Sequence, residues 1–280
     1  MIKKIYHRIR ESNIFLRLWG TKKVVLDGVE MIFSLQDPQS RVFFYHPFFR
    51  GELYEQVVTH HLIDRLKTSR CFVDVGANIG FYTVLAGKLL GGRGGVVHAV
   101  EMDLDNIRRT RINVRINRLQ NVSIHHIALG DRNGTVEYYR RESFRHTLGI
   151  SQDEQGRHQK VSVPMKTLDS LAKEFAFQPD VIKIDVEGAE YLVLMGMQKI
   201  LDQSQLEVYC EVHIDEVQGG LGSLGHSFED VWNIFRAHDF TMYEIPLRQQ
   251  NHNLQAHELK QVNEVTRSTM IYAVKNRLAG

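Results

Sequence analysis

Short apolar runs alternate with longer segments of helical periodicity along most of the chain. Apolar runs of this length indicate buried strands, whereas apolar side chains at three- and four-residue intervals indicate helices that pack on a sheet. Strands that alternate with helices form parallel sheets, so the order predicts an α/β fold. The first expected strand begins at Cys71, and the others span Val96–Val100, Val122–Ile127, Val181–Asp185, Leu206–His213, Phe240–Ile245 and Met270–Val274.

The N-terminal part of the chain carries a different pattern. Met1–Gly20 places apolar side chains on one side of a helix and basic ones on the other. Such a helix either docks on the protein or contacts a membrane surface, and both interpretations stay open. Asp27-Gly28, between Lys23–Leu26 and Met31–Leu35, predicts a hairpin. We therefore expect an extension over residues 1–50 and the main domain over residues 51–280.

An aromatic stretch, Arg41–Arg50, follows the hairpin. Packing around a loop fixed by Pro47 is the preferred interpretation. The alternative is the edge of a pocket, because aromatic rings stack on adenine or on a sugar ring.

A glycine-rich loop follows the first strand and is the strongest indication of a binding site. Asp74 precedes Gly76-Ala77-Asn78-Ile79-Gly80, and Phe81–Leu90 continues with helical spacing. The loop lacks the middle glycine of a dinucleotide-binding loop, and Asp74 would repel a pyrophosphate. It would attract S-adenosylmethionine (SAM), which carries a sulfonium and an ammonium. The alternative is an ordinary turn in which Asp74 caps the helix.

Acidic side chains also stand at the ends of the next two strands. Glu101 ends the second strand, where a carboxylate can accept hydrogen bonds from ribose hydroxyls. Its alternative role is to cap the following helix. Asp131 follows the third strand, from where it could reach an adenine amine.

The ends of the fourth and fifth strands supply the candidate catalytic groups. Lys183 and Asp185 are two positions apart, so they point to one face of a strand. Glu187 and Glu190 begin the next helix, where the helix dipole favours acidic residues in any case. His213 is the first candidate for a general base, because an unperturbed histidine pKa of about 6.5 suits neutral pH.

Asp185 or Glu187 is the second candidate for the base. Alternatively, Asp185, Glu187 and Glu211 could bind a divalent metal that lowers the pKa of a hydroxyl. An oxygen-rich set of this kind suits Mg²⁺ or Mn²⁺. The sequence leaves metal dependence open.

Composition narrows the class of protein. There are 35 Lys and Arg residues and 33 Asp and Glu residues, a balance that indicates no nucleic-acid partner. The two cysteines lie in predicted core strands, which favours buried thiols and a reducing cytoplasm. No apolar run approaches the ~18–20 residues of a membrane span. We expect a cytoplasmic protein whose N-terminal helix is its candidate contact with the inner face of a membrane.

Five motifs occur in the order FVDVGANIGFYT, VHAVE, ALGD, VIKIDVEGAE and EVH. Together they resemble the FkbM family of SAM-dependent methyltransferases, and the resemblance covers about Cys71–Glu244. It implies a Rossmann-like class I methyltransferase fold. Its sheet would have seven mostly parallel strands, the last one antiparallel, with helices on both faces. It also implies O-methylation, commonly of a sugar hydroxyl in a glycan, glycolipid or secondary metabolite.

The resemblance assigns roles to individual positions. Glu101 matches the ribose ligand and Asp131 the adenine contact. The residues that match the cofactor loop are Asp74, Gly76, Ala77, Asn78 and Gly80. The residues that match the second signature are Lys183, Asp185, Glu187 and Glu190.

Two other classes of function remain as alternatives. The first is an NAD-dependent oxidoreductase, which the missing middle glycine disfavours. The second is a nonenzymatic protein that keeps the SAM-binding fold. Methylation of nucleic acid is disfavoured by the balanced charge and by Asp185-Val186-Glu187, which stands where an aromatic dipeptide would be expected. The sequence identifies neither the acceptor nor the oligomeric state.

Overall fold

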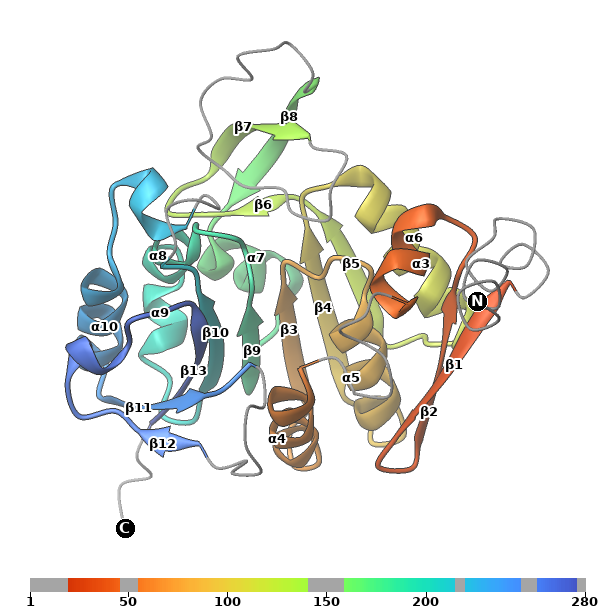
Figure 1. The fold of residues 1–280 in the computed structure, drawn as a ribbon, viewed down its shortest axis with the longest axis horizontal. Coiled ribbons are helices and arrows are strands. Elements are labelled where there is room, and N and C mark those ends of the chain that lie inside the picture. Colours follow the sequence, from red (N-terminus) through yellow and green to blue (C-terminus); the bar gives the residue numbers. More distant parts are fainter. Residues whose placement is uncertain (1–19, 46–54, 141–158, 215–219, 248–255, 276–280) are drawn as a thin grey trace, which may run out of the picture.

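The computed structural model describes residues 20–45, 55–140, 159–214, 220–247 and 256–275 (Figure 1). The predicted helix over residues 1–20 lies outside these ranges except for Gly20. Residues 46–50 of the aromatic stretch also lie outside them. No helix in the described part of the chain has the length and apolar character needed to cross a membrane.

An eight-stranded sheet forms the centre of the molecule, in the order β12-β11-β13-β10-β9-β3-β4-β5. The strands from β10 to β5 run parallel, and β13 is antiparallel to both β10 and β11. The strands are β3 (Cys71–Val75), β4 (Val96–Glu101), β5 (Val122–His126), β9 (Val181–Ile184), β10 (Glu207–Val212), β11 (Phe240–Ile245), β12 (His257–Glu258) and β13 (Thr269–Lys275).

The predicted sheet, with its last strand antiparallel, is therefore confirmed. The structure adds β12, a two-residue strand that pairs with the end of β11. The polar segment around β12 has no apolar alternation, so its sequence gave no indication of a strand.

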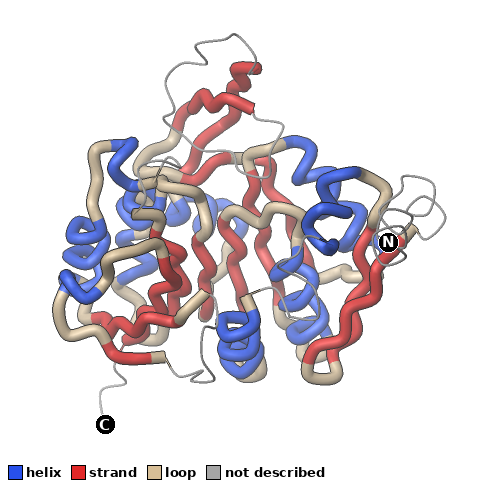
Figure 2. The backbone as a smooth tube through the Cα atoms, viewed as in Figure 1, coloured by secondary structure: helices blue, strands red, loops and turns tan. Residues whose placement is uncertain are grey.

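Helices cover both faces of the sheet, as predicted (Figures 1 and 2). One apolar core lies beneath α4 and α5, and the other lies beneath α7, α8, α9 and α10. The helices are α4 (Gln56–Leu66), α5 (Phe81–Gly91), α6 (Leu104–Ile116), α7 (Leu168–Phe175), α8 (Glu190–Met195), α9 (Gln198–Leu201) and α10 (Phe228–Ala237), with the 3₁₀ turns η3 (Leu221–Leu224) and η4 (Val262–Glu264).

Side chains along the central strands alternate between these two cores. Phe72 enters the core under α4 and α5, whereas Val73 enters the opposite one. By the same alternation Asp74 shares the face of Phe72, and the strand register pairs it with Lys183 of β9. Because side chains alternate along each strand, Asp74 and Lys183 lie on the same face, at the carboxyl edge of the sheet.

The predicted hairpin is confirmed. β1 (Thr21–Leu26) pairs with β2 (Val29–Ser34) around Asp27 and Gly28, which have φ values of 45° and 80°. It is followed by α3 (Pro38–Tyr45), which carries Phe43 and Phe44 into the core under α5. These two rings confirm the packing role, but this part of the stretch is a helix and not the expected loop. Phe43 also lines the pocket described below, so the alternative role holds for that residue as well.

A second, three-stranded sheet stands beyond the carboxyl ends of β3 and β4 (Figure 1). Its order is β6-β8-β7, from β6 (Ala128–Leu129), β7 (Gly134–Arg140) and β8 (Gln159–Lys166). Tyr138 and Met165 belong to its buried side, together with Ala189 at the start of α8. This small sheet therefore packs against the end of the main sheet where the predicted site residues gather.

Candidate active site

The glycine-rich loop follows β3 and contacts the ends of β4 and β9. Gly76 and Gly80 have φ values of 80° and 82°, in the left-handed region that favours glycine. The backbone N–H groups of Gly76 and Ala77 donate to the carbonyl of Val100, over 2.9 and 3.0 Å. A Cβ atom on Gly76 would lie 1.9 Å from the carbonyl oxygen of Asp185. The glycine therefore lets the ends of β3 and β9 come together.

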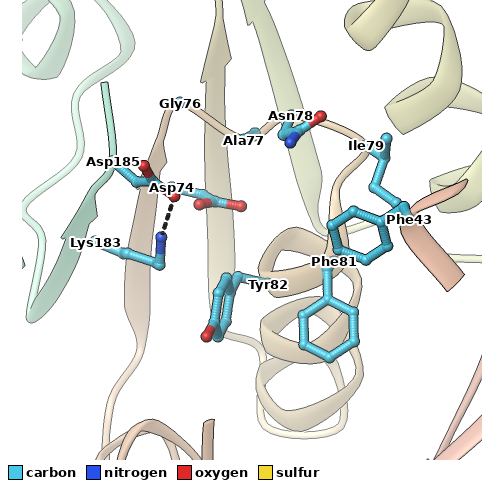
Figure 3. Close-up of a pocket in the computed structure, with 10 residues that line it drawn as sticks. All are labelled: Phe43, Asp74, Gly76, Ala77, Asn78, Ile79, Phe81, Tyr82, Lys183 and Asp185. Carbon is cyan, nitrogen blue, oxygen red and sulfur yellow. Dashed lines mark hydrogen bonds and ion pairs between the residues drawn. The ribbon is translucent and has the colours of Figure 1, made fainter. Parts of the chain in front are cut away.

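A pocket opens beside this loop (Figure 3). It encloses about 260 Å³ of empty space, a volume that includes the solvent at its open mouth. Its lining residues come from α3, β3, the loop, α5 and the end of β9, and they are Phe43, Asp74, Gly76, Ala77, Asn78, Ile79, Phe81, Tyr82, Lys183 and Asp185.

Buried charges form the floor of the pocket (Figure 3). Asp74 accepts a hydrogen bond of 2.5 Å from the Thr83 hydroxyl, and burial raises the pKa of its carboxyl. Lys183 donates to Asp185 Oδ2 over 3.0 Å, and its Nζ lies 4.8 Å from the centre of the Tyr82 ring. Burial opposes the charged form of Lys183, but the surrounding carboxylates, Asp185 first, outweigh it and raise its pKa.

Glu101 supports the loop from the end of β4. Its two carboxylate oxygens accept hydrogen bonds of 2.8 Å from the backbone N–H groups of Asn78 and Asp103. Burial raises the pKa of Glu101 to about 7. The cap of α6 itself is Asp103, which accepts from the N–H groups of Asp105 and Asn106. Glu101 lies outside the pocket lining, and its role toward ribose stays a prediction.

His213 lies at the centre of a second cluster, just past the end of β10. Its Nδ1 is 2.6 Å from Oε1 of Glu190, a residue with no exposed surface. Its Nε2 faces three carboxylate oxygens, at 3.4 Å from Glu211, 3.5 Å from Glu187 and 4.0 Å from Asp185. The predicted catalytic residues therefore come together in the fold, although they lie in different elements.

This environment changes the expected chemistry of His213. Burial lowers its pKa, but the bonds to Glu190 and Glu211 outweigh burial and raise the pKa to about 11. The ordinary value of about 6.5, on which the assignment as general base relied, does not hold in this environment. A histidine that is already protonated cannot accept a proton. A neighbouring carboxylate is therefore the better candidate for the general base.

The predicted metal ligands are only partly brought together. Donor atoms of Asp185, Glu211 and His213 all lie within 4.8 Å of one another. The structure thus groups two of the predicted carboxylates with an imidazole nitrogen rather than with Glu187.

Tyr82 and Glu55 belong to the site and were missed by the sequence analysis. Tyr82 lines the pocket and donates a 2.7 Å hydrogen bond to Oε2 of Glu55. Burial raises the pKa of Glu55 to about 7, even though Lys183 lowers it. Tyr82 follows Gly80 by two positions, in the first turn of the helix after the loop. This position could have identified it as a residue of the site. Glu55 precedes α4 without any motif, and only the fold brings it to the site.

Asp131 lies apart from these clusters. Its carboxylate is 3.1 Å from the guanidinium of Arg132, and it is not among the residues that line the pocket. Its contact with adenine stays a prediction.

Solved structures provide distant likenesses. Methyltransferase FkbM from Methylobacillus flagellatus is 17% identical, with a TM-score of 0.45, and the match covers 73% of this chain but only 43% of that one. A SAM-dependent O-methyltransferase from Thermotoga maritima is 11% identical, with a TM-score of 0.44 and coverage of 91% and 77%. The O-methyltransferase TomG from Streptomyces achromogenes is 12% identical, with a TM-score of 0.46 and coverage of 85% and 86%. These likenesses are too distant to carry an inference about activity.

Comparison at the level of sequence is more informative about the family. No curated protein matches the chain significantly. The family model for the methyltransferase FkbM domain, however, matches residues 74–242, which is more than half of the chain. The match begins at Asp74 and includes the loop, the Lys183–Glu190 segment and His213. The chain therefore belongs to the FkbM methyltransferase family.

Proposed function

We propose that this protein is a SAM-dependent O-methyltransferase whose acceptor is a sugar hydroxyl in a glycan, glycolipid or secondary metabolite. The observation that carries the proposal is the shared pocket of Asp74 and Asp185, which come from neighbouring strands and face a glycine-rich loop. Carboxylates at this edge of an α/β sheet suit a cationic ligand. The choice of a sugar follows from what the family resemblance implies.

The residues at the pocket fit SAM. When bound, SAM supplies a methyl group that its sulfonium has already activated. Asp74 offers negative charge to the positive end of the ligand, and Phe43 and Phe81 give the pocket an apolar edge. The buried Oδ1 of Asn78 has no hydrogen-bond partner among the described residues, so it is available to a donor group of a ligand. Asp74, Asn78 and Glu101 are the residues that would hold the cofactor.

The chain must also orient the acceptor and take the proton that its hydroxyl releases. Correct orientation supplies ~7–11 kcal/mol, whereas a general base supplies about 3–5 kcal/mol. Asp185 is bound to Lys183, and a carboxylate stabilised by a cation is a weak base. Glu187 also faces a cation, the protonated His213, but over 3.5 Å rather than 3.0 Å, so it is the better proton acceptor of the two.

Transfer of label tests this proposal. The protein would be incubated with methyl-labelled SAM and a panel of glycans, glycolipids and lipid-linked sugars. We expect label on one class of sugar acceptor, lost in Asp74→Asn and reduced about 10²–10⁴-fold in Glu187→Gln. Glu30→Gln, an exposed hairpin residue, is the control and should keep full activity. Label on nucleic acid, or on no acceptor at all, would contradict the proposal.

The membrane contact through residues 1–20 is a separate proposal. It is supported by the basic and amphipathic character of that segment. Flotation with anionic liposomes should be lost when residues 1–20 are deleted, and unchanged flotation would rule the contact out.

A further inference from the structure

We propose that Asp185, Glu211 and His213 bind a divalent first-row metal ion of the Mn²⁺ type beside the cofactor pocket. The inference concerns the same site as the proposed function and deepens it, because Asp185 both lines the pocket and belongs to the trio. Metal binding is nevertheless measurable without SAM, so the two proposals can fail separately.

The fold brings the three donors together through strand register. Glu211 and His213 are two positions apart at the end of β10, so both point to the face that carries Lys183. Asp185 follows β9, the parallel neighbour of β10, and lies at the same carboxyl edge. The donor atoms of the three residues consequently lie within 4.8 Å of one another.

The imidazole is oriented toward these carboxylates by a buried partner. Glu190 has no exposed surface and binds Nδ1 of His213 over 2.6 Å, while the N–H of Gly188 donates to the same oxygen over 2.9 Å. His213 is itself only 7% exposed. Its Nε2 is thereby aimed at Asp185 and Glu211. A carboxylate that holds the far nitrogen of a histidine is the usual support of a metal-ligating imidazole.

The charges around the cluster also favour a cation. Among the described residues, the carboxylates of Asp185, Glu187, Glu190 and Glu211 surround a single imidazole. Lys183 binds Oδ2 of Asp185, whereas Oδ1 is the oxygen that faces His213. The lysine and a metal ion would thus use different oxygens of one carboxylate.

The donor set indicates the kind of ion. Carboxylates alone suit Mg²⁺ and Ca²⁺, whereas an imidazole donor shifts the preference to transition metals. Three protein donors leave coordination positions for water or for an acceptor hydroxyl. An ion there would polarise that hydroxyl next to the pocket and assist its deprotonation.

The competing occupant of the cluster is a proton on Nε2 of His213, which would make the group an ion-pair network without a metal. Titration of the chelator-treated, full-length protein with Mn²⁺ separates these two cases. Unbound Mn²⁺ is followed by electron paramagnetic resonance in the absence of SAM. We expect one ion per chain, and selective paramagnetic broadening of the His213 ring resonances in the wild-type protein.

Variants test two of the three donors and the carboxylate that supports His213. Glu211→Gln and His213→Gln should weaken Mn²⁺ binding by at least about tenfold, and Glu190→Gln by about 10–100-fold. Glu30→Gln, far from the cluster, should bind as the wild type does. Thermal unfolding of each variant, without metal, identifies any that fail to fold.

Two results would overturn the inference. One is a wild-type protein that leaves Mn²⁺ free while it binds SAM normally, which would leave the proposed function standing. The other is broadening that spares the His213 ring. Mn²⁺ binding without any SAM binding would instead support the metal site and contradict the proposed function.

Discussion

The absence of a side chain at Gly76 sets the geometry of the pocket. At Gly76 the backbone is left-handed and lies against the carbonyl of Asp185, where a Cβ atom would approach to 1.9 Å. Gly28 in the hairpin has the same φ of 80°, but nothing lies within 4 Å of its Cβ position. The two glycines share a φ of 80°, and only Gly76 lies against a neighbouring backbone atom.

The substitutions Gly76→Ala and Gly28→Ala therefore form a matched pair. Each should lose about 1–2 kcal/mol from the left-handed backbone, and Gly76→Ala should lose more, because β3 and β9 must separate. Urea unfolding measures both. Equal losses in the two variants would show that the contact with Asp185 is unimportant.

The residue types of the site were predictable, but their chemical states were not. Asp74 and the loop glycines stand in one short segment, so their spacing alone indicated a cationic ligand. The state of His213 depends on Glu190 and Glu211, which come from another helix and from the same strand, at 2.6 and 3.4 Å. The spacing of residues along the sequence cannot predict those distances.

At the scale of elements, two side-chain amides at the end of α6 hold the hairpin in place, one in its last turn and one at its C-cap. Asn117 accepts from the N–H of Ile32 over 2.9 Å and donates to its carbonyl over 2.5 Å, as a neighbouring strand would. Asn113 accepts from the N–H of Ser34 over 2.9 Å. Its own amide donates to the carbonyl of Ile79 in the glycine-rich loop over 2.8 Å. The hairpin and the loop are therefore linked through one side chain.

This link predicts different effects for two similar substitutions. Asn113→Ala and Asn117→Ala should each lower the free energy of unfolding by about 1–3 kcal/mol, because buried backbone groups lose their partners. Only Asn113→Ala should also weaken SAM binding, since only Asn113 contacts the loop. Calorimetric titration on both variants checks this. Equal SAM affinities would argue that the hairpin and the loop are independent.

The order of elements followed from the sequence, but the contacts between them did not. The strands of the main sheet other than β12, the helices that cover it and the hairpin were predicted, because apolar periodicity and turn residues are local signals. Asn113 and Asn117 stand among arginines in α6 and at its C-cap, and their spacing gives no local sign of a buried role. Their buried role depends on a hairpin about 80 residues earlier in the chain, since the bonds span 79 and 85 positions.

At the scale of the whole molecule, buried titratable groups make stability depend on pH in opposing ways. His98 and His125 stack between β4, β5 and the end of α7, with 3.0 Å between their ring nitrogens. Burial first, and then His125, lowers the pKa of His98 to about 4. Glu101 and Glu55 have pKa values raised to about 7 by burial. As pH falls, protonation therefore favours the unfolded state at His98 and the folded state at the two carboxyl groups.

The histidine contribution can be isolated with His98→Gln. A depressed native pKa stabilises the fold above the unfolded value of about 6.5 and is lost as pH falls toward about 4. Between about pH 7 and pH 5 the wild type should lose about 2 kcal/mol more stability than the variant. Urea unfolding at both pH values measures the difference. Parallel losses would mean that His98 is not held neutral by burial.

The central claim is that acidic side chains at the carboxyl edge of the sheet bind the positively charged end of SAM. Titration calorimetry of the wild type and of Asp74→Asn, with SAM and with NAD, tests it most directly. We expect the wild type to bind SAM and not NAD. Asp74→Asn should bind SAM at least about tenfold more weakly, a change of ~1.4 kcal/mol, while remaining folded. Binding of NAD by the wild type, or equal SAM affinity in the two proteins, would contradict the account.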